Sequence, residues 1–399
     1  MKKLVIVTSE YFHPLRYRLH HILPFLLEKF DVKIIAIAPP LYDTLSEVRR
    51  SRAATIKFLI TKVLICFPRK SIQEQNDILI IRNLFPDSRL DFVLQVVNAV
   101  YAAWIMKLRK VHQGFDVCLA SHCFAGFSAL LAKMPIPVVY EDVDRFEFFT
   151  SSRFMKKTLG FFERYSIRNS AKVISAGFNL AKSAESIRGQ KVYCIPNSID
   201  LELFEDRYSV DADRFAIVYL GSIAPWSGLE LAIKSLRVVT SDFAEAKLIV
   251  VGTGDPEYIR KLKSLAEEFD LSDKVIFLGK RNYQEIPLII SKCGIGLALF
   301  PNIDLMRYAF SFKVVEYMAA GLPVIATDVG DTGKIIKESN CGVIVETTPE
   351  SVAEGIRRLF RNRDNMLILG KNGRQWSKDF DLKVLAEREI KVLSQFSNS

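Results

Sequence analysis

Short runs of apolar residues recur along the whole chain and alternate with longer segments of helical periodicity. The runs are rich in Val and Ile and lack an in–out alternation, which is typical of strands buried on both faces of a parallel sheet. We predict strands at Leu4–Thr8, Val32–Ile37, Val117–Ser121, Val138–Tyr140, Val173–Ser175, Tyr193–Ile195, Phe215–Leu220, Lys247–Val251, Lys274–Leu278, Ile295–Leu299, Pro323–Thr327 and Gly342–Val345. We predict helices between them, including Leu229–Arg237, Tyr258–Phe269, Phe312–Ala320 and Ser351–Arg361. This alternation predicts an α/β fold of parallel sheets flanked by helices.

The chain is long enough for two domains, and a break in the pattern divides it near the middle. It has 399 residues, and a domain has roughly 100–200. Pro196 and Asn197 interrupt regular structure, polar residues follow, and a fresh series of strands then begins. We therefore predict two doubly wound, Rossmann-like domains, 1–198 and 199–377, facing a central cleft, with a C-terminal helix at about 378–399 packing back on the first. Ligands of such sheets bind at the carboxyl ends of the strands.

The composition excludes several classes of protein. Apolar residues make up 49% and charged residues 25%, which is ordinary for a globular protein and too apolar for a disordered one. The six Cys include no CxxC pair and are too few for a disulfide framework, so a reducing cytoplasm fits best. The chain meets Glu10 too early for a signal peptide. The longest apolar span, 92–106, is shorter than the roughly 20 residues that cross a bilayer, and we expect a core or partly inserted helix there.

The net charge of +10 lies entirely in the first half of the chain. Residues 1–200 hold 29 Lys and Arg against 17 Asp and Glu. The stretch 49–70 has seven cations and no anion, and 145–172 mixes Lys and Arg with six Phe. Basic charge interleaved with apolar residues is typical of a helix on an anionic membrane surface. The alternatives are nucleic-acid binding, for which no recognisable module is present, and a Phe face that belongs to the core.

Two glycine turns in the second half follow predicted strands. Gly221 ends one strand and opens a loop to Gly228 and a helix, an arrangement that can bind anions through backbone N–H groups and the helix dipole. Gly252 and Gly254 end another strand, where glycine would let a ligand approach the backbone. Plain tight turns are the alternative in both places.

Lys313 and Glu316 are three residues apart in a predicted helix and therefore share one face. A carboxylate can accept two hydrogen bonds from ribose hydroxyls, and a nearby ammonium can meet a diphosphate. The alternative is a surface salt pair, which is common and contributes little energy.

Taken in order along the chain, these segments resemble a known family. The pieces that carry the resemblance are Ile195–Asp200, Tyr219–Gly228, Val251–Gly254, Val275–Gly279 and Glu316–Thr327. Together they resemble the family 4 retaining glycosyltransferases of the GT-B fold, within the group 1 glycosyltransferases. The resemblance covers nearly the whole chain. It implies an enzyme that transfers a sugar from a nucleotide-sugar to an acceptor with retention of configuration, the C-terminal domain holding the donor and the N-terminal domain the acceptor.

The resemblance assigns roles residue by residue in the C-terminal domain. Glu316 would bind the ribose hydroxyls, Lys313 would meet the diphosphate, and Gly221 would permit close approach of the phosphates. The loop Phe277–Tyr283 would lie near the nucleobase. The expected donor-binding residues are Gly221, Ser222, Ser227, Gly252, Gly254, Lys280, Arg307, Tyr308, Lys313 and Glu316.

Three positions depart from the pattern of the family. Ser222 stands where the family often has Arg, Ser227 where it often has Lys, and Tyr308 where it has the first Glu of a paired-glutamate motif. Leaving-group stabilisation is largely electrostatic, and loss of one such contact can cost on the order of 100-fold in rate. We expect Lys313, Arg307 and backbone N–H groups to compensate.

In the first half the resemblance is looser. Arg16, Arg18 and His20 follow the first strand and could meet an acceptor phosphate, or could simply form a basic surface helix. His122 ends one predicted strand and Asp142 follows another. With Lys313 they are the expected catalytic residues, His122 and Asp142 as general-base or acceptor-orienting groups. The alternative for a His at a strand end is a structural role.

Asp142 and Asp144 spell a DxD triplet, which holds a metal ion in a different glycosyltransferase fold. Because the landmarks favour two similar domains, we expect no essential metal and no cofactor. The expected partners are a nucleotide-sugar, a lipid-linked or saccharide acceptor and an anionic membrane surface, with no nucleic acid. The expected location is peripheral, on the cytoplasmic face of the membrane. Two alternatives are a non-catalytic relative acting in an assembly complex and a nucleotide-sugar epimerase.

Overall fold

The computed structural model describes residues 1–9, 18–38, 72–75, 77–82, 91–204 and 213–396. The chain divides into two compact units, Met1–Pro196 with Ala386–Ser399, and Asn197–Leu385. The second boundary falls inside one helix, α16 (Leu382–Leu393). The basic stretch 49–70 and Arg16 lie outside the described residues.

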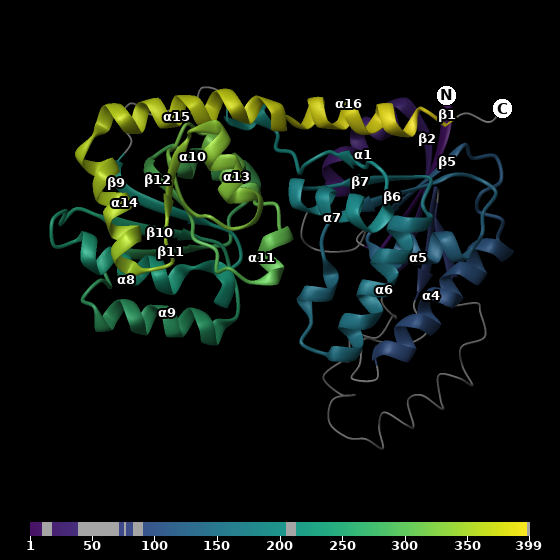
Figure 1. Ribbon diagram of the computed structural model, residues 1–399, viewed down its shortest axis with the longest axis horizontal. Helices are drawn as coiled ribbons and strands as arrows, with labels where there is room; N and C mark the ends of the chain where they lie inside the picture. The colour runs from purple at the N-terminus through teal and green to yellow at the C-terminus, as the bar shows by residue number, and fades with distance from the viewer. Residues whose placement is uncertain (10–17, 39–71, 76, 83–90, 205–212, 397–399) are drawn as a thin grey trace, which may run out of the picture. The chain divides into compact units, whose positions relative to one another are not determined.

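The first unit is built on an eight-stranded sheet (Figure 1). Its strands are β1 (Lys2–Thr8), β2 (Phe30–Ala38), β3 (Ile72–Gln75), β4 (Ile78–Arg82), β5 (Val117–Ser121), β6 (Val138–Asp142), β7 (Lys172–Ser175) and β8 (Tyr193–Cys194). They lie in the order β3-β4-β2-β1-β5-β6-β7-β8, and only the β3–β4 pair is antiparallel. Strands β5 and β6 are buried at every residue, as expected of strands covered on both faces. The strand order changes direction between β1 and β5, which is the switch point where such sheets bind ligands.

The strand series of the first unit extends beyond the predicted runs. The hairpin of β3 and β4 was not predicted, because its apolar run Ile78–Ile81 is short and stands alone among polar residues. In the fold, β4 is completed by parallel pairing with β2. Strand β6 continues to Asp142, so Glu141 and Asp142 end a strand instead of starting a loop.

Helices cover both faces of this sheet. They are α1 (Arg18–Lys29), α4 (Asp91–Leu108), α5 (Cys123–Leu131), α6 (Arg153–Asn169), α7 (Phe178–Arg188) and part of α16, with a 3-10 turn η1 (Phe146–Phe149). Helix α4 is a core helix on one side, where Ala99, Ala102 and Met106 are fully buried, while Trp104 and Leu108 on its other side are exposed. Among the described residues, no helix combines the length and the apolar character needed to span a bilayer.

The second unit has a six-stranded sheet that is parallel throughout. Its strands are β9 (Asp213–Leu220), β10 (Lys247–Val251), β11 (Val275–Gly279), β12 (Cys293–Ala298), β13 (Val324–Thr327) and β14 (Gly342–Val345). They lie in the order β11-β10-β9-β12-β13-β14. The direction of the strand order therefore changes between β9 and β12, and the ligand-binding end of this sheet is where Leu220 and Ala298 end their strands.

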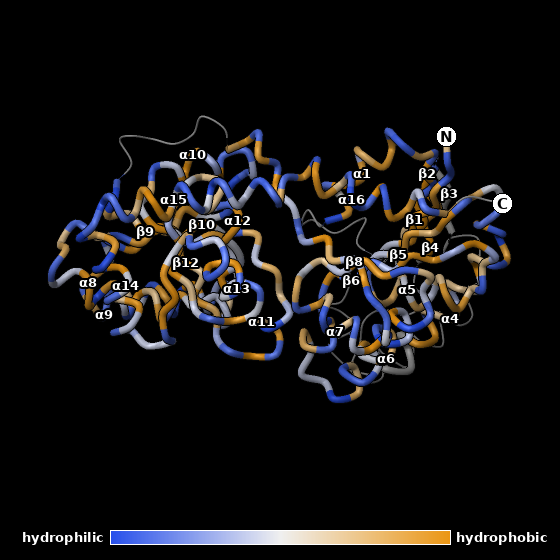
Figure 2. Tube along the Cα trace, turned by 45° about the horizontal axis from the view of Figure 1, so that its top comes forward, coloured by the Kyte–Doolittle hydropathy of each residue, from blue (hydrophilic) through white to orange (hydrophobic). Residues whose placement is uncertain are grey.

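The helices of the second unit carry apolar faces toward its sheet. They are α8 (Leu229–Val239), α9 (Pro256–Glu268), α10 (Ile286–Ile290), α11 (Asp304–Tyr308), α12 (Phe312–Ala319), α13 (Gly330–Ser339), α14 (Pro349–Arg361) and α15 (Arg363–Ser377), with 3-10 turns η2 (Leu201–Phe204), η3 (Pro225–Ser227), η4 (Tyr283–Glu285) and η5 (Lys378–Phe380). Figure 2 shows the strands drawn largely in orange and the helices alternating between orange and blue. The predicted helices at 229–237, 258–269, 312–320 and 351–361 are confirmed, with ends that differ by up to two residues.

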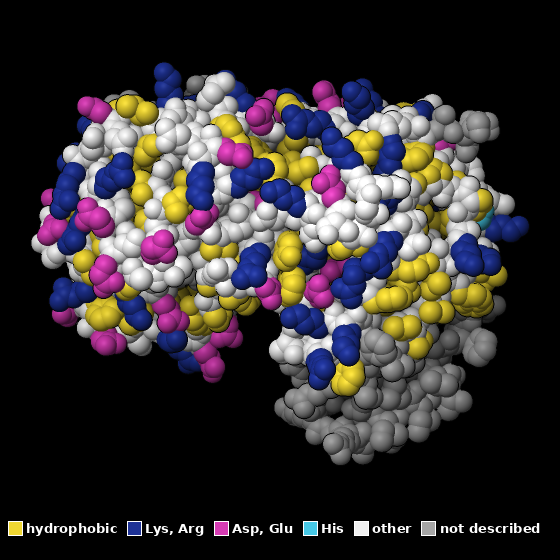
Figure 3. Space-filling view, viewed as in Figure 1, with side chains coloured by type: hydrophobic (Ala, Val, Ile, Leu, Met, Phe, Trp, Pro, Cys, Tyr) yellow, Lys and Arg dark blue, Asp and Glu magenta, His cyan; other side chains and the backbone are white. Residues whose placement is uncertain are grey.

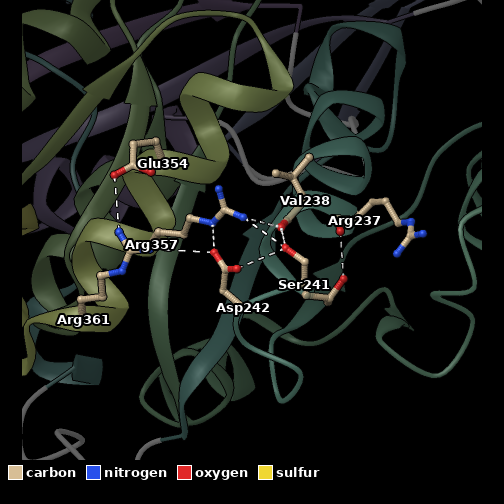
Figure 4. A network of polar contacts seen from close by, with 8 residues as sticks. Arg237, Val238, Ser241, Asp242, Glu354, Arg357 and Arg361 are labelled. Carbon is tan, nitrogen blue, oxygen red and sulfur yellow. Dashed lines mark hydrogen bonds and ion pairs between the residues drawn. The ribbon is translucent and has the colours of Figure 1, made fainter.

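A polar network fastens α14 to the turn after α8 (Figure 4). Arg357 donates to the carbonyl oxygen of Val238 at 2.9 Å and to Ser241 Oγ at 3.2 Å, and its Nε lies 2.6 Å from a carboxylate oxygen of Asp242. A cation on the last carbonyls of a helix is favourable because it meets the negative end of the helix dipole. The network holds two helices that pack together over the sheet.

Candidate functional site

Helix α12 is fixed over the switch point of the second unit by Tyr317. The Tyr317 hydroxyl accepts a hydrogen bond from the Leu220 backbone N–H at 2.8 Å and donates to the Leu297 carbonyl at 3.4 Å, so it bridges β9 and β12. Gly296 makes room for the ring, since a Cβ there would lie 2.3 Å from it. Lys313, one turn earlier on α12, is thereby brought to the carboxyl ends of these strands.

The Lys313 ammonium sits on aromatic rings. Its Nζ lies 3.8 Å from the centroid of the Tyr219 ring and 5.3 Å from that of Phe300. It also lies 3.3 Å from the place that a Cβ on Gly221 would occupy, and Gly221 has a left-handed φ of 120°. The prediction placed Gly221 and Lys313 at one phosphate site, and the structure brings the two together.

Glu316 lies one turn further along the same helix face and accepts a hydrogen bond from the Tyr283 hydroxyl. Burial raises the pKa of Glu316 to about 7, and Lys313 and Tyr283 offset part of that rise. Burial lowers the pKa of Lys313 to about 7, with Glu316 opposing the shift. Burial, Glu316 and Asp200 all raise the pKa of Tyr283, which therefore stays a hydrogen-bond donor at neutral pH. With a pKa of about 7, both Glu316 and Lys313 can change protonation state at neutral pH. A bound anion would favour the charged form of Lys313, and hydroxyl donors would favour the charged form of Glu316.

The second pair of glycines serves loop packing. A Cβ on Gly252 would lie 1.8 Å from the carbonyl oxygen of Gly221, and a Cβ on Gly254 would lie 1.8 Å from that of Ile223. The two loops are joined by the Ile223 N–H, which donates to the Thr253 carbonyl at 2.9 Å. The expectation that Gly252 and Gly254 leave space for the donor is therefore corrected, because the neighbouring loop fills that space.

The two serines that replace family cations have different surroundings. Ser222 is exposed, and its carbonyl accepts a hydrogen bond from the Tyr219 hydroxyl at 2.7 Å. Ser227 is buried, and its Oγ accepts a hydrogen bond from the Leu229 N–H at 3.4 Å, at the start of α8. Burial makes Ser227 part of the loop structure, so the expectation of direct donor binding by Ser227 is corrected.

The remaining predicted donor residues are Lys280, Arg307 and Tyr308. Lys280 is exposed in the loop after β11. Arg307 is exposed and is held on its own helix α11 by Asn302 and Asp304, each at 3.1 Å, so the geometry gives no support to its compensating for missing cations. Tyr308 is half-buried at the end of α11.

His122 stands at the switch point of the first unit, directly after β5. It has a positive φ of 84°, which is rare and strained for a residue with a side chain. Its Nδ1 accepts a hydrogen bond from the Phe124 N–H at 3.3 Å and caps α5, and its ring lies 3.8 Å from that of Phe146. Burial lowers the pKa of His122 to about 4, so the imidazole is neutral at physiological pH. Because Nδ1 is an acceptor, the neutral ring carries its proton on Nε2.

Asp142 is fully buried and engaged by protein groups. It accepts hydrogen bonds from Arg145 at 2.5 Å and from Ser175 at 3.1 Å. An ion pair of this kind leaves Asp142 poorly suited to act as a general base, and the expectation of a catalytic Asp142 is corrected on that ground. Across the described ranges of the chain, no three His, Cys, Asp or Glu side chains meet in a geometry that could hold a metal ion.

Arg18 is also buried and engaged on all three guanidinium nitrogens. It donates to Glu141 and Glu389 at 2.5 Å each and to the carbonyl of Pro196 at 2.7 Å. These contacts make Arg18 a structural residue, which corrects its predicted role at an acceptor phosphate. His20 lies on α1, and its side chain is outside the described part of the chain.

Sequence reasoning missed the aromatic members of the site. Tyr219, Tyr283 and Phe300 were given no role of their own, because each is a lone aromatic residue at a strand end or in a loop, although Tyr283 ends the loop expected near the nucleobase. They are recognised as site residues only because they contact Lys313 and Glu316. The order of strands in the sheet brings these residues together, and the sequence does not show that order.

The comparison with known families rests on the second unit. Residues 202–376 match the family described as glycosyl transferases group 1. The second unit is a group 1 glycosyl transferase domain. Lys313, Glu316, Gly221 and the aromatic residues around them all belong to this glycosyl transferase domain.

Relatives of the glycosyl transferase domain come from distant organisms. The chain is 26% identical over 239 residues to an uncharacterised glycosyltransferase of Methanocaldococcus jannaschii, covering 60% of this chain and 63% of that protein. It is 26% identical over 175 residues to a GDP-mannose-dependent α-(1-6)-phosphatidylinositol monomannoside mannosyltransferase of Mycobacterium tuberculosis, covering 41% and 43%. The chain thus spans between 43% and 63% of the length of these relatives. The solved structure of Anabaena HepE in complex with UDP matches with a TM-score of 0.69 and 18% identity, over 99% of this chain and 100% of that one. This likeness confirms the GT-B fold.

Proposed function

We propose that the protein is a glycosyltransferase that moves a sugar, with retention, from a nucleotide-sugar to an acceptor. The observation that carries the proposal is the position of Lys313 and Glu316, side by side at the switch point of a group 1 glycosyl transferase domain. A neighbouring fold was solved with UDP, and one relative is named for a GDP-mannose donor, so we propose a nucleoside diphosphate-sugar donor without fixing its base.

In this proposal each group acts on one part of the donor. The Glu316 carboxylate exchanges its hydrogen bond from Tyr283 for hydrogen bonds from the ribose hydroxyls. The Lys313 ammonium and the open backbone at Gly221 face the diphosphate, whose charge grows as the sugar leaves. Removal of a donor group aimed at such developing charge costs about 100- to 1000-fold in rate.

The test of the ribose contact is Glu316→Gln, compared with Glu338→Gln, an exposed residue on α13. Binding of a nucleoside diphosphate and of its 2′-deoxy counterpart is measured by calorimetry for UDP, GDP and ADP. We expect the wild-type protein to prefer the ribose form, and Glu316→Gln to lose most of that preference while Glu338→Gln keeps it. Equal preference in Glu316→Gln and the wild type would refute the ribose contact, and absence of product with every nucleotide-sugar would refute the enzyme.

His122 is proposed to orient the acceptor. With Nδ1 accepting from the backbone, its Nε2–H is the group that can donate to an acceptor hydroxyl. Since its pKa is about 4, the ring keeps one charge state from pH 5.5 to 8. We expect His122→Ala to raise the acceptor KM without changing the pH dependence of kcat over that range, and a lost acid limb in the variant would contradict this role.

We propose that the acceptor is lipid-linked, or a saccharide at a cytoplasmic membrane face, and that the first unit binds the anionic surface. The surface that supports this proposal consists of exposed apolar side chains, namely Val100, Trp104 and Leu108 of α4 and Phe154 and Phe161 of α6. Exposed basic residues lie beside it: Lys107 in the last turn of α4, Arg109 and Lys110 directly after that helix, and Arg153 and Lys157 on α6. Figure 3 shows hydrophobic side chains gathered over this part of the first unit with Lys and Arg nearby. Apolar side chains rimmed by cations suit an anionic lipid surface.

The membrane proposal is tested with vesicles of phosphatidylcholine alone and with added phosphatidylglycerol. We expect co-sedimentation only with the anionic vesicles, weakening as salt rises. The variant Trp104→Ser with Phe161→Ser should lose it, while Ile368→Ser, an equally exposed apolar residue of α15, should not. Binding that is unchanged by the double variant would move the contact to another surface.

A further inference from the structure

The amine at the proposed donor site is held in an unusual way. Lys313 takes part in none of the ion pairs of the described residues, and Glu316, its charged neighbour, stands one turn away on the helix. Its Nζ lies over the ring faces of Tyr219 and Phe300, at 3.8 Å and 5.3 Å from their centroids. A ring face attracts a cation most when water is excluded, as in this largely buried place.

Both rings are rigidly placed. The Tyr219 ring is 3% exposed on the central strand β9, and its hydroxyl donates to the Ser222 carbonyl at 2.7 Å. The backbone of Phe300 is fixed to Thr327, whose Oγ1 accepts from the Phe300 N–H and donates to the Phe300 carbonyl, at 2.8 Å each. The two rings therefore form a fixed seat for a flexible lysine chain.

The seat also aims the amine. A Cβ on Gly221 would lie 3.3 Å from Nζ and 3.9 Å from the Tyr219 hydroxyl, so ring, amine and open backbone converge at one point. The two family cations on this loop are replaced by Ser222 and the buried Ser227. Neither serine carries a charge, so Lys313 supplies the positive charge beside Gly221.

We propose that Tyr219 is a positioning residue of the donor site: its ring, assisted by that of Phe300, holds the Lys313 ammonium over Gly221 to meet the diphosphate. The inference rests on the proposed function, because it presumes that a nucleoside diphosphate binds here. The ring also favours the charged form of the amine, opposing the burial that lowers its pKa. The other titratable groups facing this place are Glu316 on α12 and Tyr283 on η4, with Asp200 beyond Tyr283.

The experiment compares Tyr219→Leu with Tyr219→Phe in the full chain, and with Phe215→Leu as a matched control. Phe215 lies on the same strand and carries its own cation contact, from Arg214 at 4.5 Å, away from the switch point. Binding of UDP, GDP and ADP is measured against the corresponding nucleosides. We expect Tyr219→Leu to weaken the diphosphate about tenfold, within the range of a desolvated cation–π contact, and to leave the nucleoside unchanged. Tyr219→Phe should recover most of the loss.

A second measurement keeps the inference falsifiable if Tyr219→Leu fails to fold. Phenylalanines with one, two and three ring fluorines at position 219 keep the shape of the ring and weaken its negative face step by step. We expect a stepwise loss of diphosphate affinity and a stepwise fall in the Lys313 pKa measured by NMR of the ammonium. A flat response in both, or equal loss of nucleoside and diphosphate in Tyr219→Leu, overturns the seat. If the wild type binds no nucleotide, the proposed function fails, and the NMR titration alone decides on the seat.

Discussion

Replacement of Gly252 by alanine tests how the two glycine loops are built. The new Cβ would lie 1.8 Å from the Gly221 carbonyl oxygen, whereas real Cβ contacts are essentially never under 3.0 Å. One loop must move by more than an ångström. That movement strains the hydrogen bond from the Gly221 N–H to the Val251 carbonyl and the one from the Gly252 N–H to the Gly279 carbonyl, each 3.0 Å long.

The magnitude follows from two terms. Two hydrogen bonds weakened or lost cost about 1 kcal/mol each, and a side chain at a φ of 147° costs about 1–3 kcal/mol. The sum is about 3–5 kcal/mol of unfolding free energy. For a unit of this size, 1 kcal/mol shifts Tm by about 2–4 °C, so we expect Tm to fall by roughly 10 °C.

The matched control is Gly279→Ala, at the end of the neighbouring strand. Gly279 also has a left-handed φ, of 71°, but a Cβ there would meet nothing within 4 Å. Its cost is therefore only conformational, about 1–2 kcal/mol. Calorimetric melting of the full chain measures both variants, and binding of UDP, GDP and ADP reports whether the Gly221 loop has moved. If Gly252→Ala melted no lower than Gly279→Ala, the close approach of the two loops would be wrong.

Three further predictions concern charged groups. Glu316 and Lys313 both have a pKa of about 7, and the carboxylate gained by Glu316 as the pH rises opposes the loss of the charged amine, so the test uses Glu316→Gln. In that variant the affinity for a nucleotide-sugar should fall as the pH rises from 6 to 8.5, and calorimetry of an intact donor checks this because its diphosphate does not titrate there. Arg145→Met leaves Asp142 buried without its cation and should cost about 3–5 kcal/mol in urea unfolding. Lys383→Met breaks an exposed pair with Glu202 and should leave the unfolding free energy nearly unchanged. Burial raises the pKa of Glu389 to about 7, above the value of about 4.3 in an unfolded chain. Between these two pH values the folded state binds more protons than the unfolded state. The free energy of unfolding therefore falls as the pH rises from about 4.5 to 7. Glu389→Gln should flatten that slope in urea unfolding at pH 5 and 8, and an unchanged slope would contradict the assignment.

The sequence pattern predicts most of the parallel strands because they are buried on both faces. The strand at Val117–Ser121 matches the structure to the residue, and the start of β9 differs by only two residues from the predicted Phe215. The hairpin of β3 and β4 was missed, because β4 becomes a strand through pairing with β2, whose partner residues are 44 positions earlier in the sequence, as in Ile34 with Ile78. Apolar runs report burial well and pairing partners poorly.

The site was predictable where chemistry lies in one helical turn and not where it comes from several elements. Lys313 and Glu316 share a turn, so their spacing alone marked them. The seat of Tyr219 and Phe300 joins the ends of two strands, which only the sheet order brings together. Residues such as Arg18 and Asp142 carry the same charge whether they bind a ligand or a buried partner, and a sequence does not distinguish the two.

The helix that ends the chain changes how parts of this protein can be exchanged. Residues from Ala386 onward belong to the first unit, and Glu389 completes the set of oxygens around Arg18. A chimera that takes its first 196 residues from a relative must also take that relative's final segment. Otherwise the residues at the positions of Arg18 and Glu141 would pack against a final helix from a different protein. Recombination at two crossovers, near Pro196 and near Leu385, is therefore the way to exchange the first unit while keeping the second.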